Sequence, residues 1–551
     1  MIDKKLWLKP AFALVLAGSL VACAGNNGNN VSPAPSSSAP TSEGASASAT
    51  DSASNGVTNW KVGDNVSLKW YLNFGWWDYN KKWLEYPVLK EVSDITGVVP
   101  EVSIPTGDGT EKVNLMIATN TLPDLVTMDQ NDPSVQKLIS QGLVYSYDEL
   151  IEQYAPELKN EIPTDVWNYS KADDGKLYGL PSFFLPQWQY DEKYGVGANA
   201  YNVRKDIYEE LGKPDMTTPD GLYNALKAFK EKYPTINGKA SIPMTLYENA
   251  GYTFMIERSF GLESYYVDGD QIQHNFKDPR YLEVVKYLNK LAREGLLDPE
   301  MYIKKVDQIN EDMASGRIFS APHNNVNLVN SVNASLEQAK SGSGFIAVEP
   351  MKNQAEVKLP GYNRLGWTTT MVTKQAKDPE AAIKFIRYMW SKEGNTLVNY
   401  GHEGVDYTIE NGWLKQSPAV LEESTKDPHG WSERTGIFTF RLFNYSYYKV
   451  EWPGSPEQVA NRELADKYAF DNTLMTFKMS PDPTSPEGII NTQVNELMKN
   501  EFPKVVLADS EEKAVSTFQA LIDKMDKVGL PKLEAYWTDR YNKNVAKFTG
   551  E

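Results

Sequence analysis

Hydrophobic and polar residues alternate along residues 65–74, NVSLKWYLNF. Every second side chain is apolar, and a period of two is the pattern of a β-strand with one buried face. The segment runs into a turn, GWWD, at residues 75–78. The pattern therefore predicts that the folded part of the chain opens with a strand.

A helical period follows this turn. Its apolar stripe comprises Leu84, Val88, Val92 and Ile95, and Gly97 follows as a stop signal, so we expect a helix through about Ile95. The next segments are VVPEVSI, a helical EKVNLMIATN and a strand-like DLVTM. Strands that alternate with helices predict an α/β fold with a largely parallel sheet.

Further helices are predicted later in the chain. Residues 281–293 are expected to be helical, with a stripe of Leu282, Val285, Leu288 and Leu291 and a C-terminal stop at Gly295. Asp378 and Pro379 suit the N-cap and first position of another helix. Residues 510–548 are expected to be mostly helical.

The N-terminal residues carry a targeting pattern. Lys4, Lys5 and Lys9 precede an uncharged run, AFALVLAGSLVA, at residues 11–22. This run is too short to span a bilayer, which takes about 20 residues, so it predicts a secretory signal over residues 1–22. The last four residues, LVAC, resemble the bacterial lipobox, which implies cleavage before Cys23 and a lipid on its sulfur. The alternative is an ordinary signal peptide beside an incidental cysteine.

Residues 24–58 consist largely of Ser, Ala, Gly, Asn and Pro. Because such a segment cannot bury enough apolar surface to fold, we expect residues 23–58 to be a lipidated cysteine and a disordered tether. The remaining residues, 59–551, are long enough for two or more domains.

The net charge and the aromatic content of the chain indicate which kinds of partner it could bind. The chain has 56 Lys and Arg against 73 Asp and Glu, a net charge of −17, which argues against nucleic acid as a partner. Its 14 Trp and 31 Tyr include rings in polar, turn-like contexts, where a flat face suits stacking on a sugar.

Three predicted strand ends carry polar or aromatic side chains, and ligands of open α/β sheets bind beyond such ends. The candidates are Trp76, Trp77 and Asp78 after the first strand, Asp129 after DLVTM, and His323 and Asn324 after RIFSAP. Other interpretations stay open: the tryptophans are equally compatible with core packing, Asp129 with capping a helix, and His323 with a structural hydrogen bond.

Seven further segments follow one another in a characteristic order. They are NLMIATNTLPDLV (114–126), GLVYSYDEL (142–150), DGKLYGLP (174–181), RKD (204–206), KYLNKLAREGLLDPE (286–300), DPEAA (378–382) and GHEGVDYT (401–408). In this order they resemble the extracellular solute-binding proteins of carbohydrate ABC transporters, especially the large lipoproteins of Gram-positive bacteria. The resemblance spans roughly residues 66–410.

The resemblance implies an α/β, two-lobe periplasmic-binding-protein-like fold over residues 59–551, with an interlobe ligand cleft that closes by hinge motion. The lobes would be discontinuous, with crossings near 180–190, 320–330 and 365–375. It further implies an oligosaccharide ligand, an ABC permease as partner, and no catalysis or cofactor. The protein would be a monomeric receptor, lipid-anchored on the extracellular face of the cell membrane.

The implied fold would place further candidate ligand-binding residues near those at the three strand ends. They are Trp188, Tyr190, Tyr247, Glu248, Trp367, Trp431 and Arg434, with Phe184 and Glu433 beside them. Aromatic rings would stack on sugar faces, and charged groups would read hydroxyl directions. Each aromatic is also compatible with core packing. Arg434 or Arg441 in the site would favour an acidic sugar, because guanidinium pairs with carboxylate in a bidentate way.

One segment departs from the resemblance. Some members of that family carry a calcium loop rich in carboxylates, whereas the corresponding YPTINGKASI at residues 233–242 has none. Calcium is held by several oxygen ligands, commonly charged ones. We therefore predict that this segment binds no metal.

Two other functions remain open. A glycoside hydrolase or lyase would need two carboxylates about 5 Å or about 6.5–9.5 Å apart, and Asp78, Asp129, Glu248 and Glu433 are available. The same architecture also serves receptors for peptides or other small solutes.

Overall fold

The structure is a computed structural model. It describes residues 59–551 apart from residues 76, 78, 108, 247–252, 325–332, 334–335, 337–343, 354–355, 444–446, 452–455 and 550–551. The unit Asn59–Glu551 is compact by itself and holds all the hydrophobic clusters discussed below. The predicted signal peptide, Cys23 and the predicted tether lie outside the described residues.

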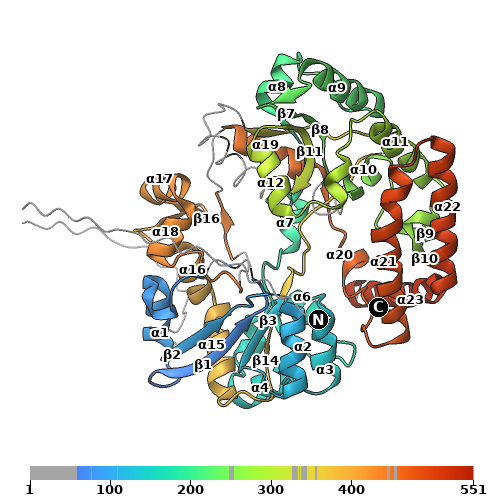
Figure 1. Cartoon of the computed structure of the whole chain (residues 1–551). Coiled ribbons are helices and arrows are strands. Elements are labelled where there is room, and N and C mark those ends of the chain that lie inside the picture. The colour runs from blue at the N-terminus through green and yellow to red at the C-terminus, as the bar shows by residue number, and fades with distance from the viewer. Residues whose placement is uncertain are drawn as a thin grey trace, which may run out of the picture. The chain divides into compact units, whose positions relative to one another are not determined.

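A five-stranded sheet with strand order β2-β1-β3-β14-β4 forms the first half of this unit (Figure 1). The predicted first strand is β1 (Val66–Leu72), which pairs in parallel with β2 (Val98–Ser103) and β3 (Leu125–Asp129). Strand β14 (Thr368–Val372) is antiparallel to both β3 and β4 (Leu180–Pro181). We call this sheet and the elements packed on it the first lobe.

The helices of the first lobe contribute to its core with the sheet. They are α1 (Pro87–Thr96), α2 (Gly109–Thr119), α3 (Pro133–Ser140), α4 (Tyr147–Tyr154), α5 (Leu158–Glu161), α6 (Thr164–Ser170), α15 (Pro379–Trp390), α16 (Lys392–Tyr400), α17 (Pro418–Lys426) and α18 (Pro428–Thr435), with the 3-10 turn η1 (Trp83–Glu85). A small sheet is formed by β15 (Tyr407–Glu410), β16 (Trp413–Gln416) and β17 (Lys449–Val450), and α17 and α18 lie between β16 and β17 in the chain.

A second, four-stranded sheet has the order β12-β5-β11-β8. Its strands are β12 (Phe345–Val348), β5 (Asn199–Arg204), β11 (Ile318–Asn324) and β8 (Ile242–Met244). We call this sheet and its elements the second lobe. Its short strand pairs are β6 (Thr235–Ile236) with β7 (Lys239–Ala240), β9 (Tyr265–Asp268) with β10 (Gln271–His274), and β13 (Leu359–Pro360) with β18 (Ala469–Phe470).

The remaining elements belong to the second lobe or join it to the first. They are α7 (Gln187–Asp191), α8 (Lys205–Glu210), α9 (Pro219–Lys232), α10 (Thr253–Ser259), η2 (Asn275–Lys277), α11 (Tyr281–Arg293), η3 (Pro299–Tyr302), α12 (Val306–Ala314), α19 (Pro456–Tyr468), α20 (Thr473–Thr476), α21 (Pro486–Val506), α22 (Glu511–Val528) and α23 (Leu530–Thr549).

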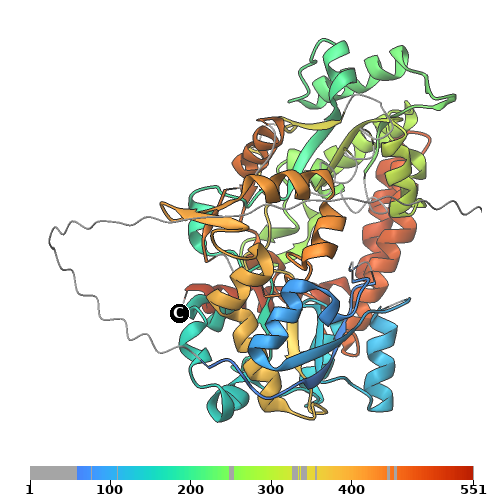
Figure 2. The ribbon, with the colours of Figure 1, turned by 90° about the vertical axis from the view of Figure 1, so that its left-hand side faces the viewer.

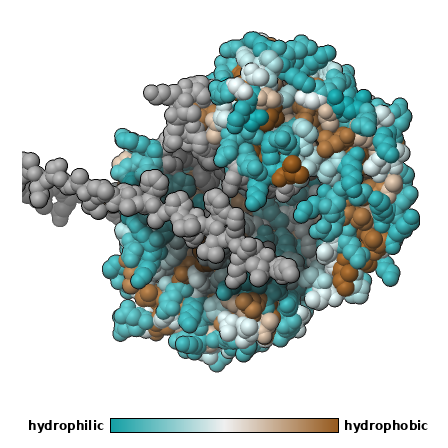
Figure 3. Space-filling view, in the orientation of Figure 1, coloured by the Kyte–Doolittle hydropathy of each residue, from teal (hydrophilic) through white to brown (hydrophobic). Residues whose placement is uncertain are grey.

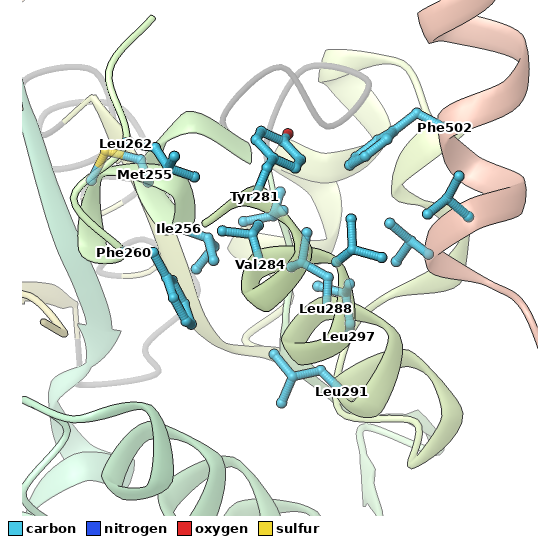
Figure 4. Packing of buried hydrophobic residues seen from close by; sticks show 14 of the residues in the cluster. Met255, Ile256, Phe260, Leu262, Tyr281, Val284, Leu288, Leu291, Leu297 and Phe502 are labelled. Carbon is cyan, nitrogen blue, oxygen red and sulfur yellow. The ribbon is translucent and has the colours of Figure 1, made fainter. Parts of the chain in front are cut away.

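The C-terminal helices complete the core of the second lobe. Helices α21 and α22 pack against α11, far earlier in the chain (Figures 1 and 2). Tyr281 and Leu288 of α11 lie in one buried cluster with Phe502 of α21 (Figure 4), and Phe518 of α22 belongs to the same cluster. The predicted stripe of residues 281–293 is wrong at Leu282, which is 36% exposed, because Val284 takes its place on the buried face.

The chain leaves the first sheet after β4 and returns to it before β14. After β14 it passes through the small sheet, which ends in β17, and then enters β18 of the second lobe. The crossing predicted near residues 320–330 needs correction, because β11 and β12 on either side belong to the same sheet. Strand β11 lies inside that sheet, antiparallel to β5 and parallel to β8.

Several predicted local signals match the structure. Gly97 ends α1 with a left-handed φ of 70°, and the Asp378 side chain accepts the Ala381 N–H at the start of α15. The segment predicted to bind no metal contains a tight hairpin, with Asn237 and Gly238 at positive φ between β6 and β7. No helix in the described part of the chain is long and apolar enough to cross a membrane.

Candidate functional site

The first sheet reverses its direction of winding between β1 and β3. Strand β1 lies between β2 and β3, so the chain moves to one side of β1 and then to the other. Such a switch point leaves a crevice at the carboxyl ends of the strands, where open α/β sheets bind ligands. Here β1 runs into Phe74, and β3 ends at Asp129.

Four aromatic side chains meet at these strand ends, and we call Phe74, Trp77, Phe183 and Trp367 the aromatic cluster. The ring centroids of Phe74 and Trp367 are 4.8 Å apart, and those of Phe74 and Trp77 are 6.0 Å apart. Phe183 stacks toward Trp367 at 6.5 Å with an interplanar angle of 22°. Phe74 and Trp77 are buried, whereas Phe183 and Trp367 are half-buried and keep part of their surface available to a ligand.

Backbone pairing holds Trp367 against the end of β3. The Gln130 backbone N–H donates to the Trp367 carbonyl at 2.9 Å, and the Gln130 side-chain amide donates to the Gly366 carbonyl at 2.8 Å. Gly366 has a left-handed φ of 66°, and a side-chain carbon there would overlap the Ser182 carbonyl oxygen. The ring is therefore positioned by both sheet and loop contacts.

Arg441 borders the aromatic cluster. The carbon at the centre of its guanidinium lies 4.3 Å from the Phe438 ring centroid, 5.9 Å from that of Phe183 and 6.0 Å from that of Trp77. Burial lowers the pKa of Arg441 from its ordinary value, and the nearby Tyr362 opposes this change. The group remains a cation at neutral pH.

Two of these rings are carried on strained backbone. Phe183 and Phe438 have φ values of 54° and 64°, a region that bulky residues rarely adopt. The other non-glycine residues with positive φ in the described part of the chain are asparagines and lysines. Backbone strain of this kind concentrates at ligand sites, where the surrounding structure maintains it.

Asp129 adds a carboxylate beside the cluster. Its Oδ1 accepts the Asn131 backbone N–H at 2.8 Å. Burial raises the pKa of Asp129, and the hydrogen bond from Asn131 opposes that rise. A carboxylate with remaining acceptor capacity can receive sugar hydroxyls.

The other predicted site residues lie in different places. Tyr190 is buried and donates a hydrogen bond to the Tyr362 carbonyl, and burial raises its pKa. Trp188 stacks with Tyr194 at 6.1 Å, outside the aromatic cluster. Trp431 is 6% exposed and packs in the core of the first lobe, which corrects its assignment as a free stacking ring.

Arg434 is engaged on an exposed helix. Its guanidinium pairs with Asp427 at 3.0 Å and lies 3.7 Å from Glu423. Glu433, on the same helix, lies 3.5 Å from Lys81. These pairs explain the local charges of α18 without a ligand.

Trp76, Asp78, Tyr247 and Glu248 lie outside the described residues. The backbones of His323 and Asn324 end β11, paired with Ala200 and Asn199.

Sequence reasoning missed three aromatic residues of the site: Phe74, Phe183 and Phe438. Phe74 ends the alternating segment NVSLKWYLNF, so its strand-end position was an available signal. Phe183 precedes Phe184, which is fully buried in the core, whereas Phe183 faces Arg441. The strained φ values of Phe183 and Phe438 have no simple sequence signature.

A pocket of about 210 Å³ lies elsewhere, beside α3 and α23. Lys478, Asp482 and Arg540 are among its lining residues, and Arg540 already pairs with Asp173 in a bidentate way at 2.6 and 2.8 Å. It lacks a pair of stacked rings, so the aromatic cluster is the stronger candidate site. Across the described ranges no group of three or more His, Cys, Asp or Glu residues could hold a metal ion.

Comparisons with known proteins match both sequence and fold. A family model for bacterial extracellular solute-binding proteins matches residues 89–400. Lipoprotein LipO of Bacillus subtilis (strain 168) is 22% identical over 384 residues, which are 66% of this chain and 71% of LipO. The polygalacturonan/rhamnogalacturonan-binding protein YtcQ of the same strain is 22% identical over 328 residues, 58% of this chain and 63% of YtcQ.

A solved structure extends the comparison over most of the chain. The ABC-transporter substrate-binding protein FusA of S. pneumoniae, in complex with kestose, has a TM-score of 0.68 at 19% identity. The match covers 87% of this chain and 99% of FusA. The protein therefore has the mixed α/β, two-lobe fold of solute-binding proteins. Because the family model matches more than half of its residues, this chain belongs to the bacterial extracellular solute-binding protein family.

Proposed function

We propose that this protein is a receptor that binds an oligosaccharide at the aromatic cluster and delivers it to an ABC-type permease. The aromatic cluster carries the proposal. Small-molecule sites combine apolar and aromatic walls with a few polar groups that fix orientation. Phe183 and Trp367 offer half-buried rings, while Asp129 and Arg441 offer an acceptor and a set of donors.

The relatives support a sugar as the ligand class. YtcQ is named for polygalacturonan and rhamnogalacturonan, and FusA is described in complex with kestose. These ligands differ in charge but share the ring faces and hydroxyl groups of an oligosaccharide. A peptide or another small solute is the alternative that the experiment must exclude.

The connections between the lobes would act as the hinge. Phe184 pairs with Leu365, and the Leu185 N–H donates to the Arg364 carbonyl at 2.9 Å, so the outgoing and returning segments lie side by side. A change of backbone angles in such paired segments would close the second lobe over a ligand on the first.

Membrane anchoring belongs to the same proposal. The sequence of residues 20–23 and the lipoprotein relative LipO support a lipid on Cys23. A tether of residues 23–58 would let the receptor reach a permease in the same membrane, since flexible chains of about 35 residues span roughly 30–35 Å.

Catalysis is not part of the proposal. The family consists of solute-binding proteins, and the described candidates for a carboxylate pair have other neighbours. Asp129 accepts from the Asn131 backbone, and Glu433 lies beside Lys81.

A thermal-shift screen tests the ligand class. Residues 59–551 would be heated with neutral oligosaccharides, acidic oligosaccharides and peptides. A ligand at 100 times its Kd adds about 2.7 kcal/mol to the native state, so a true ligand raises the Tm measurably. Stabilisation by one glycan class, with the glycan recovered intact, is expected. Stabilisation by peptides alone, or a flat response to all glycans, would contradict the proposal.

A further inference from the structure

We propose that Arg441 binds a carboxylate of the ligand, so that the receptor selects oligosaccharides containing uronic acid residues. The inference rests on the proposed function, because it assigns a chemical class to the ligand of the same site. The geometry points to it through the surroundings of Arg441, the backbone that carries its neighbours, and the charge of the whole chain.

The guanidinium of Arg441 is enclosed by rings. Phe438, Phe183 and Trp77 lie 4.3, 5.9 and 6.0 Å from its central carbon. Aromatic faces attract a cation, but they supply none of the strong acceptors that the five N–H groups of an arginine require. Within the described residues, no carboxylate lies within ion-pair distance of Arg441 and no acceptor receives a hydrogen bond from it.

Other shielded arginines of this protein have carboxylate partners. Arg204 pairs with Asp206, Arg387 with Glu161, and Arg540 with Asp173. Arg441 is half-buried, so water reaches its guanidinium in the free protein, but water is a weaker partner for this charge than a carboxylate. At Arg441 the protein thus keeps an uncompensated cation where a ligand carboxylate would supply the missing acceptors.

Two strained residues flank this cation. Phe183 and Phe438 are the aromatic residues with positive φ in the described ranges, and both lie against Arg441. They come from distant parts of the chain, one after β4 and one after α18. Their shared strain indicates that the position of the guanidinium is under strong structural constraint.

A carboxylate suits this group better than a hydroxyl does. Guanidinium is planar and always charged, and it binds carboxylate through two parallel hydrogen bonds. The chain carries a net charge of −17, so its overall field repels an anion. A local, aromatic-lined cation is what an acidic sugar would need to bind this acidic protein.

Paired ligands test the inference. The probes are oligogalacturonates, oligoglucuronates and alginate oligomers, each with its carboxyl-reduced counterpart, which has the same linkages but no charge. Affinities are measured by isothermal titration on residues 59–551. One acidic probe is expected to bind, and its reduced counterpart to bind about 10- to 150-fold more weakly, the range for a hydrogen bond to a charged group.

Variants locate the effect. Arg441→Gln should weaken the acidic probe to a similar extent and leave the reduced probe almost unchanged. The affinity of Arg441→Lys for the acidic probe should lie between those of the native protein and of Arg441→Gln, because lysine keeps the charge but cannot form the two parallel hydrogen bonds of a guanidinium. Arg434→Gln removes the same charge from α18 and should leave binding within about twofold, the scatter of a surface substitution. Circular dichroism and the Tm confirm that each variant is folded.

The outcomes separate this inference from the proposed function. If acidic and reduced probes bind equally, or if only neutral probes bind, selection by Arg441 is wrong and the oligosaccharide receptor stands. An unchanged affinity of Arg441→Gln for the acidic probe also overturns the inference. If no oligosaccharide of either kind binds, both proposals fail.

Discussion

The hydroxyl of Tyr190 donates a hydrogen bond to the backbone carbonyl of Tyr362. Tyr190 lies on the chain leaving the first sheet, and Tyr362 lies on the chain returning to it. The Tyr362 N–H in turn donates to the Val196 carbonyl at 2.9 Å. Gly361 permits this approach, because a side-chain carbon there would come within 2.6 Å of the Tyr190 hydroxyl. The two connections are thus tied together.

Removing this tie should destabilise the protein. Tyr190→Phe keeps the buried ring but removes the hydroxyl that donates to the Tyr362 carbonyl, which costs about 1 kcal/mol or more of unfolding free energy. Tyr223→Phe is the matched control, since its hydroxyl bonds Glu294 at the solvent-exposed surface at 2.6 Å. Urea unfolding measures both. Equal stability of the two variants would show that the tie contributes nothing.

Gly366 sets the position of Trp367. Gly366→Ala places a methyl group against the Ser182 carbonyl oxygen and strains a φ of 66°. Gly412→Ala has the same kind of φ, 81°, but meets no atom within 4 Å. We expect Gly366→Ala to lower the free energy of unfolding by more than about 1 kcal/mol beyond the control and to weaken ligand binding. Equal costs would mean that only backbone strain matters there.

Lys478 should make stability depend on pH. Its ammonium group and that of Lys547 both donate to the Lys171 carbonyl. Burial, and next the charge of Lys547, lower the pKa of Lys478 to about 7. An unfolded lysine titrates near about pH 10.4. The destabilising effect is therefore fully present below about pH 7 and is relieved as the pH rises toward about 10.

The variant Lys478→Met removes this titration. The unfolding free energy of the native protein, relative to that of Lys478→Met, should rise between pH 7 and pH 9.5. Lys239→Met, on an exposed residue of β7, should show no such trend. A pH-independent difference between the native protein and Lys478→Met would show that Lys478 titrates as an ordinary lysine.

Cys23 should decide where the protein is found. In a Gram-positive host, Cys23→Ala removes the sulfur that carries the proposed lipid and should move the protein from the membrane fraction to the medium. Ser36→Ala, in the proposed tether, should stay with the membrane. Cell fractionation with immunoblotting measures both. Membrane retention of Cys23→Ala would contradict the anchor.

Local periodicity predicted much of the first lobe. The alternation in residues 65–74 became β1, Gly97 ended α1, and Asp378 capped α15, because each depends on neighbours in sequence. Pairings between strands that lie far apart in the sequence could not be predicted in this way. Strand β14 pairs with β3 although more than two hundred residues separate the two strands in the sequence, and no local sequence pattern predicts the register of this pair.

The residues of the candidate site could likewise be predicted only in part. Trp77, Asp129 and Trp367 were predicted and lie at the strand ends, since the carboxyl ends of strands are a general place for ligands. Trp431 was predicted to bind the ligand but packs in the core. The sequence alone does not distinguish a tryptophan that packs in the core from one that faces a ligand. Phe183 and Phe438 depend on strained backbone angles that only the folded structure defines.

The most direct test of the account is a titration at Trp367. Isothermal titration would compare native residues 59–551, Trp367→Ala and Trp413→Ala, using the oligosaccharide that stabilises the native protein most. Trp413 is a half-buried tryptophan on β16, outside the aromatic cluster. We predict about a tenfold or greater loss of affinity for Trp367→Ala and little change for Trp413→Ala. Native affinity in Trp367→Ala would contradict binding at the aromatic cluster.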